Sequence, residues 1–360
     1  MGSQIVQADL YAVSLPYVTP VEWTTGGVAT HAHYVVARIV NRDGQVGAAE
    51  VPCFAAWNGM SQAALMQLFR DVAWPMLSAG GGKPLPRSVR DVGALTVLID
   101  NLMGDLDCGI AGVKPPRDIG PAVFVITRGT PADMADIADQ AAARGFAAVK
   151  IKLGQGLDTD RAAMDAIRRA VGDDLPLCAD ANGAYGPTEV GMLLDAARDY
   201  GLFFIEDPCP LAPLSAQLGG LRDTPVPIVL DRYCNSVLAA RQFIEFGFNH
   251  FAAKPTRVGI TDAQAVIDVA AADGGKAVIG LFGESAAGAL TQLRLAASAP
   301  AGVLLGIEAS AHEALADNFL AVPVGVRDGV YQAPASLHLA SAIDWQKLEA
   351  LAQNSLSLRI

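Results

Sequence analysis

Charged residues recur at nearly regular intervals through the middle of this chain, each one directly after a short apolar run. Lys152, Asp180, Glu206, Asp231 and Lys254 follow one another at spacings of 28, 26, 25 and 23 residues. Apolar runs of four to seven residues bounded by turn signals are typical of buried strands in a parallel sheet. Each interval has the length that a strand, a helix and two loops require. The pattern therefore predicts repeated strand–helix units.

The same pattern extends beyond these five charges. The intervals contain amphipathic, alanine-rich segments at residues 158–171, 187–200, 213–222 and 236–247, which we expect to be helices. Further apolar runs lie at residues 122–126, 277–281 and 303–307. The total is eight strands, each followed by a helical pattern, which predicts a (β/α)8 barrel. Catalytic groups of such barrels lie at the C-terminal ends of the strands, where these charges fall.

The segments outside the barrel predict a second, α+β unit. Strands are expected at residues 4–16, 33–40 and 45–51, with helices at 61–77 and 87–106. Two aromatic loops, 21–29 with Trp23 and 53–59 with Trp57, interrupt the N-terminal pattern. A hairpin at 324–331 and a helix at 345–351 follow the last barrel strand and are expected to return to the N-terminal unit. The predicted organisation is an α+β capping domain at 1–118, a barrel at 119–322 and a C-terminal segment at 323–360 that completes the cap.

Composition excludes several classes of function. The net charge of −11 argues against binding to nucleic acid or to anionic membranes. Apolar residues make up 52% of the chain and charged residues 18%, so a large core is available. No apolar run is long enough for a membrane span, and no signal peptide is visible. The five cysteines have no CxxC spacing and are interpreted as free thiols, so we expect a cytoplasmic protein.

The charged strand ends suggest a metal site. Asp180, Glu206 and Asp231 offer hard carboxylate oxygens from three successive strands, a set that suits Mg2+ or Mn2+. The alternative is that the acids only form structural ion pairs with basic residues of the barrel. Lys152 and Lys254 come from opposite walls and would face the two sides of a substrate. A lysine with a lowered pKa can remove a proton next to a carboxylate, and a metal stabilises the resulting enediolate.

Short motifs at the strand ends carry a resemblance to a known family. They are KIK at 150–152, DAN at 180–182, EDP at 206–208, KPTRVG at 254–259 and GES at 283–285. With these motifs the chain resembles the enolase superfamily and, within it, the muconate lactonizing enzyme subgroup. The resemblance covers nearly the whole chain, including an N-terminal capping domain whose two loops close over the mouth of the barrel.

The resemblance implies a role for each motif residue. Asp180, Glu206 and Asp231 would bind Mg2+, and Lys152 and Lys254 would form the acid/base pair. The residues implied to lie at the substrate are Lys150 and Asn182 at its carboxylate, together with Glu284 and the lid residues Trp23 and Trp57. A homo-oligomer is also implied, because barrels of this family often assemble into dimers or octamers.

Three departures from the family pattern bear on specificity. Arg232 and Tyr233 follow Asp231 where Asp-Glu-Ser is usual, which alters the charge beside the metal and the partners open to Lys254. Only Val258-Gly259 stands where Gly-Gly is expected after strand six. Strand eight has a single acid, Glu308, instead of the Asp-x-Asp that resembles the ammonium site of dipeptide epimerases.

The predicted function is that of a Mg2+-dependent isomerase or lyase acting on a small carboxylate, with muconate cycloisomerisation as the leading reaction. The alternatives are racemisation, epimerisation or dehydration of amino-acid derivatives such as N-acyl amino acids, dipeptides, cyclic amino acids or betaines, and o-succinylbenzoate synthesis. All share one enolate core, so the core motifs do not separate them. A different class is a non-catalytic barrel that binds a carboxylate but has lost turnover through the change at Arg232.

Overall fold

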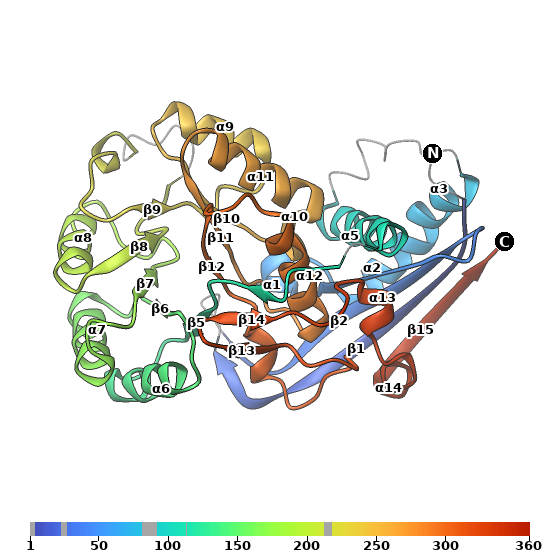
Figure 1. Cartoon of the computed structure of the whole chain (residues 1–360), viewed down its shortest axis with the longest axis horizontal. Helices are drawn as coiled ribbons and strands as arrows, with labels where there is room; N and C mark the ends of the chain where they lie inside the picture. The colour runs from blue at the N-terminus through green and yellow to red at the C-terminus, as the bar shows by residue number, and fades with distance from the viewer. Residues whose placement is uncertain (1–3, 23–26, 81–91, 113, 212–217) are drawn as a thin grey trace.

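The computed structural model describes residues 4–22, 27–80, 92–112, 114–211 and 218–360. Two parts lie side by side in it, a barrel formed by the middle of the chain and a sheet with helices formed by both ends (Figure 1). The N-terminal and C-terminal segments meet on the side away from the barrel strands (Figure 1). This is the expected α/β barrel with an α+β capping domain that the C-terminal segment completes.

An antiparallel sheet of four strands forms the capping domain. Its order is β15 (Ala352–Arg359), β1 (Ile5–Glu22), β2 (Val28–Asn41) and β3 (Val46–Pro52). The expected hairpin is present between β2 and β3, where the Asn41 side chain accepts hydrogen bonds from the backbone of Asp43 and Gln45. β1 and β2 extend further than the sequence suggested, so residues 21, 22, 28 and 29 of the expected loop 21–29 belong to strands. Residues 23–26 of this loop, including Trp23, lie outside the described residues.

The two faces of this sheet pack against different cores. Val35, Ala49 and Val51 face the helices of the capping domain, whereas Tyr34 and Val36 belong to the core shared with the barrel. The period of two along a strand produces this division. A sheet buried on both faces thus joins the capping domain to the barrel.

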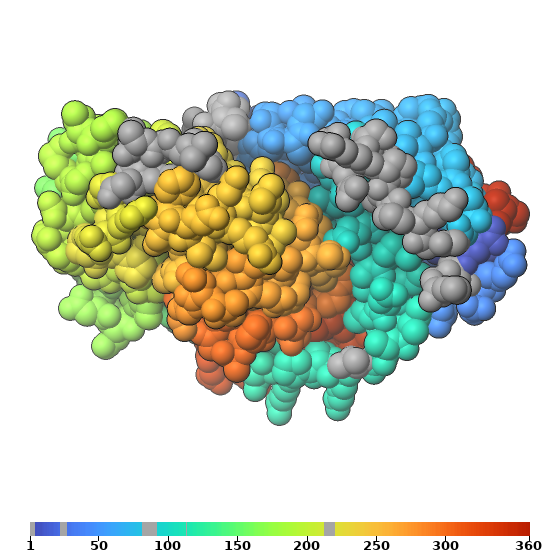
Figure 2. Space-filling view, turned by 90° about the horizontal axis from the view of Figure 1, so that it is seen from above, coloured from blue at the N-terminus to red at the C-terminus, as the bar shows by residue number. Residues whose placement is uncertain are grey.

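The helices of the capping domain follow β3 in sequence. They are α1 (Ala55–Asn58), α2 (Gln62–Leu68), the π-turn η1 (Phe69–Ala73), α3 (Trp74–Ala79) and α5 (Gly93–Ala111). The expected loop 53–59 therefore contains one helical turn. In the space-filling view, α5 lies directly against the helices of the barrel (Figure 2). Asn101 of α5 makes part of this contact, because its side chain binds the backbone of Pro255 and Ile260.

The barrel contains the eight predicted strands. They are β5 (Val123–Ile126), β6 (Ala148–Lys152), β7 (Leu177–Asp180), β8 (Leu202–Glu206), β9 (Ile228–Val229), β10 (His250–Ala253), β11 (Lys276–Ile279) and β12 (Leu304–Ile307). They form a parallel sheet from β5 to β9 and another from β10 to β12. Isolated bridges join the two, Leu230 to Phe251 on one side and Ala122 to Ile307 on the other. The ring is therefore closed at two narrow seams.

Helices surround the barrel between successive strands. They are α6 (Pro131–Ala143), α7 (Leu157–Val171), α8 (Val190–Asp199), α9 (Val237–Glu245), α10 (Pro255–Val258), α11 (Ile260–Ala272) and α12 (Ala286–Ser298). Local signals fix their starts: Thr130 caps α6 ahead of Pro131, and Ser285 caps α12. The helix expected at 213–222 is not seen. Residues 213–217 lie outside the described part, and Leu218–Leu221 forms one 3-10 turn, η2.

The segments around the barrel complete the chain. They are β4 (Asp118–Ile119), the 3-10 turn η3 (Ala311–Ala314), β13 (Gly325–Arg327), β14 (Val330–Gln332), α13 (Leu339–Ala342) and α14 (Trp345–Leu351). The expected hairpin at 324–331 pairs with β4, whereas β15 pairs with β1. The domain boundaries at 118/119 and 322/323 stay predictions. No helix in the described part of the chain combines the length and the apolar character needed to cross a membrane.

Candidate active site

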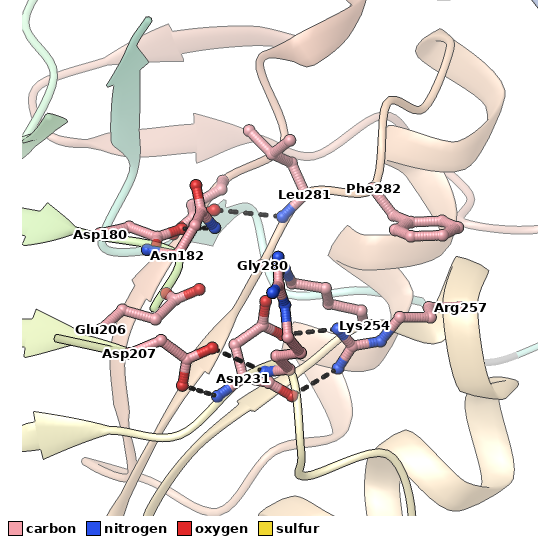
Figure 3. A network of polar contacts seen from close by, with 12 residues as sticks. Asp180, Asn182, Glu206, Asp207, Asp231, Lys254, Arg257, Gly280, Leu281 and Phe282 are labelled. Atoms are coloured by element: carbon pink, nitrogen blue, oxygen red, sulfur yellow. Dashed lines mark hydrogen bonds and ion pairs between the residues drawn. The ribbon is translucent and has the colours of Figure 1, made fainter. Parts of the chain in front are cut away.

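Four of the five charges that define the sequence pattern lie together at the C-terminal ends of the barrel strands in Figure 3, namely Asp180, Glu206, Asp231 and Lys254. Lys152, Asp180 and Glu206 pair in register across β6, β7 and β8, which places them at one level. Asp231 follows β9 and Lys254 follows β10. Asp180 and Glu206 are fully buried, and Asp231 and Lys254 are only 5% and 6% exposed. Such burial of charge is costly unless the charges are paired or bind a metal.

The Asp180 carboxylate is held by the turn that follows β7 and by the neighbouring strand β6. Its Oδ1 accepts the backbone N–H of Asn182 at 2.7 Å, and its Oδ2 accepts from the Asn182 side chain at 3.0 Å. Lys152 Nζ donates to the same Oδ2 at 2.5 Å. Asn182 adopts a left-handed backbone conformation with φ of 49°, a conformation that asparagine tolerates better than most residues. The structure thus brings together the predicted residues Lys152, Asp180 and Asn182.

Lys150 lies deeper in the barrel than Lys152 and contacts two acids. Its Nζ donates to Glu206 Oε2 at 2.9 Å and forms a second ion pair with Glu308. The other oxygen of Glu308 accepts the backbone N–H of Leu281 at 3.1 Å. The single acid of strand eight is therefore already engaged by a cation and a backbone donor.

Asp231 interacts with two cations from the neighbouring strand end. Lys254 Nζ donates to Asp231 Oδ2 at 2.7 Å, and Arg257 Nη1 lies 2.7 Å from Oδ1. Arg257 Nη2 also donates to the backbone carbonyl of Asp231 at 3.1 Å. Arg257 was not among the predicted site residues. It stands one helical turn after Lys254, on α10, and this spacing was the available signal.

Asp207 is a second residue that the sequence did not single out. It is 3% exposed, and its carboxylate accepts the backbone N–H groups of Asp231 and Arg232 at 3.1 and 2.9 Å. Its own backbone is left-handed, with φ of 40°. Asp207 thereby fixes the turn that presents Asp231, while the Arg232 side chain is exposed. The partner of Lys254 remains Asp231, so the change at Arg232 does not displace it.

The electrostatics of the three acids differ. Burial and the nearby Asp180 raise the pKa of Glu206 well above its usual range. Burial also raises the pKa of Asp180 and of Asp231, but neighbouring cations lower it more. The pKa of each of these two acids therefore lies below its ordinary value. Lys152 and Lys150 outweigh burial at Asp180, and Arg257 and Lys254 outweigh it at Asp231.

The lysine that follows β10 does not have the lowered pKa expected of a base. Burial lowers the pKa of Lys254, but the Asp231 carboxylate raises it more, so the net shift is upward. If the Asp231 carboxylate bound another group, it would no longer raise the pKa of Lys254. The state of Lys254 therefore depends on what Asp231 binds.

The donor set fits a hard divalent cation. Glu206 Oε1 is buried and has no hydrogen-bond partner within the described part of the chain. Glu206 stands on the middle strand between those that present Asp180 and Asp231, and the acids destabilise one another's charge. A dication would reverse that repulsion. As they stand, no three His, Cys, Asp or Glu side chains among the described residues converge closely enough to hold an ion. Asp180 pairs with Lys152, and Asp231 pairs with Lys254 and Arg257.

One wall of the site is formed by the segment between β11 and α12. Glu284 is 1% exposed, and its carboxylate binds the backbone N–H of Phe282 and the hydroxyl of Thr256. Phe282 packs against Trp57 of α1 at a centroid distance of 5.5 Å, and Phe54 lies 4.8 Å from Trp57. Trp57 thus reaches this wall from the capping domain, and Glu284 lies behind it.

Comparisons with known proteins identify the family of this chain. Residues 133–346, more than half of the chain, match the family model described as Enolase C-terminal domain-like. D-galactarolactone cycloisomerase of Agrobacterium fabrum is 37% identical over 86 residues, which cover 24% of this chain and 23% of the relative. Hydrophobic dipeptide epimerase of Enterococcus faecalis is 32% identical over 103 residues, 29% of each protein. These matched stretches span about a quarter of the length of the curated relatives.

Longer matches are weaker in identity. D-Ala-D/L-Ala epimerase of Cytophaga hutchinsonii is 24% identical over 291 residues, 74% of this chain and 76% of the relative. Solved structures that share the whole fold include the following two. A probable mandelate racemase from Alicyclobacillus acidocaldarius has a TM-score of 0.83 at 22% identity and covers 99% of each chain. The muconate lactonizing enzyme from Pseudomonas putida has a TM-score of 0.82 at 19% identity and covers 98% of this chain and 100% of its own.

The family model covers the strands that present all the buried acids and lysines of the site. The structural likeness extends over the capping domain as well. The dipeptide epimerase from Cytophaga hutchinsonii, another protein of this fold, was solved in complex with Mg and a dipeptide. By its match to the family model, this chain belongs to the enolase superfamily.

Proposed function

We propose that this chain is a Mg2+-dependent isomerase or lyase that removes a proton from the carbon next to a carboxylate. The observation that carries the proposal is the placement of three buried carboxylates on successive strands between two lysines from opposite walls. Asp180, Glu206 and Asp231 would hold the ion, and Mn2+ suits the same ligands. The ion supplies electrostatic stabilisation of the negative charge that develops on the substrate carboxylate.

The chain's own residues would do the remaining work. Lys152 would act as acid or base on one face of the substrate and Lys254 on the other. Each lysine now donates to a proposed metal ligand, so binding of a cation by that acid would free the amine. At Lys254 it would also weaken the interaction with Asp231 that raises the pKa. Lys150 and Asn182 would orient the substrate carboxylate. The buried wall with Glu284 and the side chain of Trp57 would exclude water. Trp23, which lies outside the described residues, is proposed to contact the substrate as well.

The charge pattern favours a substrate without a free ammonium group. Glu308 is engaged by Lys150 and the Leu281 N–H, and Glu284 by Thr256 and the Phe282 N–H. Neither acid is left to receive a substrate cation. A small carboxylate such as cis,cis-muconate meets this condition and fits the apolar wall of Phe282 and Trp57. Muconate cycloisomerisation is therefore the first reaction to assay.

Epimerisation of amino-acid derivatives is the second candidate. A lysine on each face is the arrangement that inverts a carbon, because one amine removes the proton and the other returns it. Two relatives that match two thirds or more of this chain, at 24–26% identity, are an L-Ala-D/L-Glu epimerase and a D-Ala-D/L-Ala epimerase. N-acyl amino acids combine this chemistry with the absence of an ammonium group. Shorter matches to o-succinylbenzoate synthases add a dehydration to the same set.

Two assays separate these reactions. Loss of the ultraviolet absorbance of cis,cis-muconate, dependent on Mg2+ and abolished by a chelator, would establish a cycloisomerase. Proton NMR in D2O, with N-acyl amino acids and dipeptides as substrates, would reveal exchange at the α-carbon. We expect exchange or turnover to disappear in Lys152→Ala and in Lys254→Ala. Full activity in either variant would refute the two-base assignment.

A non-catalytic barrel is the alternative from another class. It would bind carboxylates, as judged by thermal shift, without exchanging any α-proton. The exposed position of Arg232 speaks against this alternative, because Lys254 and Arg257 are the cations at Asp231. Exchange in D2O by the wild-type protein would exclude it.

Three further expectations belong to the proposal. The domain boundaries at 118/119 and 322/323 are testable by limited proteolysis. The homo-oligomer expected from the family is testable by light scattering coupled to size exclusion. The cytoplasmic location is testable by cell fractionation.

A further inference from the structure

Two buried side chains of the capping domain reach across to the wall of the site. Tyr34 of β2 donates its hydroxyl to the backbone carbonyl of Gly283 at 3.0 Å. Glu50 of β3 accepts the backbone N–H of Ser285 at 3.0 Å and also binds the Ser285 hydroxyl. Both side chains are 1% exposed. We call these hydrogen bonds, from Tyr34 to Gly283 and from Ser285 to Glu50, the cap contact.

The register of the sheet explains why these two residues act together. Tyr34 pairs with Pro52 and Val36 with Glu50, so Tyr34, Val36 and Glu50 all point to the face that packs on the barrel. The cap contact is therefore built into the sheet and does not depend on the aromatic loops.

The cap contact encloses a functional segment. Between Gly283 and Ser285 stands Glu284, whose carboxylate holds Phe282 and Thr256. Thr256 follows Lys254 by two residues, and Phe282 carries the aromatic contact with Trp57. Residues 280–285 thus connect the capping domain to the segment that begins at Lys254.

The surroundings of Glu50 favour this role. Ser285 caps the 13-residue helix α12, so Glu50 lies at the positive end of its dipole. A Cβ on Gly288 would come within 2.8 Å of Glu50 Oε1 and 2.7 Å of Glu284 Cβ, so only glycine leaves room for both acids. Among the described residues, the titratable groups coupled to Glu50 include Tyr34, Cys53 and Glu284, which are all acids. Burial raises the pKa of Glu50 to about 8, so the group is mostly a neutral acid at pH 7.

We propose that Glu50 is a positioning residue, which fixes residues 280–285 through Ser285 so that the wall of the site forms only when the capping domain is docked. The capping domain would then hold the wall segment 280–285 in place, in addition to covering the mouth of the barrel. This inference rests on the proposed function only for its effect on catalysis. Its structural part is independent of any substrate.

Hydrogen–deuterium exchange of the full-length protein without substrate tests the structural part. In Glu50→Ala we expect the amides of residues 282–288 to exchange about tenfold faster than in the wild type, because the acceptor at Ser285 is lost. Glu50→Gln keeps an acceptor of the same reach and should show wild-type exchange. Tyr34→Phe should accelerate exchange only near Gly283.

Two variants separate this effect from a general loss of packing. Val36→Ala removes a buried side chain from the same face, next to Glu50, without touching Ser285. It should lower stability but leave the relative protection of residues 282–288 unchanged. If Glu50→Ala does not fold, Glu50→Asp, with its shorter reach, should show the accelerated exchange. Wild-type exchange in Glu50→Ala, or in Glu50→Asp, would overturn the proposal.

Kinetics provide the second readout once a substrate is known. Glu50→Ala should lower kcat by about tenfold or more with a smaller change in KM, because the wall is misplaced and not removed. Glu50→Gln should restore kcat to within about twofold of the wild type. Failure to find any substrate would count against the proposed function and leave the exchange result standing. Unchanged kcat in Glu50→Ala would overturn the catalytic part.

Discussion

At the scale of single residues, the site is a set of carboxylates that lysine and metal would share. Lys152 donates to Asp180 at 2.5 Å and Lys254 to Asp231 at 2.7 Å, so each lysine occupies an oxygen that we assign to the ion. Under the proposed function, binding of the ion and release of the lysine amine would then be one event. Proton abstraction would become possible only after the ion has arrived.

This competition predicts the effect of removing either lysine. In Lys152→Met and Lys254→Met we expect Mg2+ to bind more tightly, by roughly one order of magnitude or about 1.4 kcal/mol, because a competing cation is gone. Isothermal titration calorimetry measures the affinity directly. In Glu206→Gln, which removes the carboxylate with the free oxygen, affinity should fall at least about tenfold. Weaker binding in both lysine variants would contradict the shared-carboxylate model.

The sequence predicted the site residues at the strand ends, but not the residues whose partners lie far away in the chain. Lys152, Asp180, Glu206, Asp231 and Lys254 were found because a charge after a short apolar run is a local pattern. Glu50 and Ser285 are 235 residues apart, and no local pattern announces that they meet. Arg257 was missed for another reason, since its partner Asp231 belongs to the preceding strand.

At the scale of elements, α12 depends on an unusual glycine. Gly288 lies in the first turn of the helix, where a Cβ would approach Glu284 and Glu50 to less than 3.0 Å. Gly191, in the first turn of α8, has no atom within 4 Å of the same position. The two glycines are thus a matched pair: an added Cβ would be crowded at Gly288 and would have open space at Gly191.

We expect opposite results from alanine at these two positions. Gly191→Ala should stabilise the protein by up to about 1 kcal/mol, since alanine favours helix. Gly288→Ala should destabilise it by roughly 1–3 kcal/mol, because overpacking outweighs the gain in helix propensity. Chemical denaturation of both variants measures the difference. Stabilisation by Gly288→Ala would show that Glu50 and Glu284 move aside freely.

The strands of the capping sheet were predicted in part. The hairpin of β2 and β3 was found because a turn sequence separates two alternating segments. β15 was not found: its sequence, AQNSLSLR, is polar, and only Leu356 and Leu358 pack against the core of the capping domain. The strand forms because β1 offers it an edge.

At the scale of the whole molecule, the C-terminal strand closes the outer edge of the capping sheet. Removal of residues 352–360 would expose the edge of β1, which β15 covers from Gln7 to Val13. We expect the melting temperature to fall by roughly 5–10 °C, with more aggregation on heating. Differential scanning calorimetry with light scattering measures both. Asn354→Ala, at an exposed position in the same strand, should melt like the wild type, and an unchanged melting temperature after truncation would contradict this account.

Docking of the two parts should also depend on pH. The pKa of Glu50 is about 8 in the folded protein and 4.5 in its ordinary state, so the folded protein binds more protons between these values. Its contribution to stability is full below pH 4.5 and is lost as pH rises toward 8, by up to about 1.4 kcal/mol per pH unit.

Glu50→Gln is the variant that tests this dependence. It does not titrate, so its free energy of unfolding relative to the wild type should increase steadily from pH 5 to pH 8. Urea denaturation at each pH measures this difference in the free energy of unfolding. The contribution of Glu284 to its pH dependence largely cancels, because Glu284 titrates in both proteins. A difference that is constant with pH would show that Glu50 is ionised throughout.

The narrow seams of the barrel have a consequence for its chemistry. Backbone pairing between β9 and β10, and between β12 and β5, is limited to isolated bridges. Asp231 with Lys254 and Arg257 spans the first seam, and Lys150 with Glu308 connects strands on the two sides of the second. The five-stranded and three-stranded parts of the barrel are thus linked at the active end by ion pairs, and Asp231, Lys254 and Lys150 in these pairs are also proposed to act on the ion or the substrate. Ion binding and proton transfer would break and re-form ion pairs of this kind in each catalytic cycle. Turnover and the closure of the barrel would therefore depend on the same side chains.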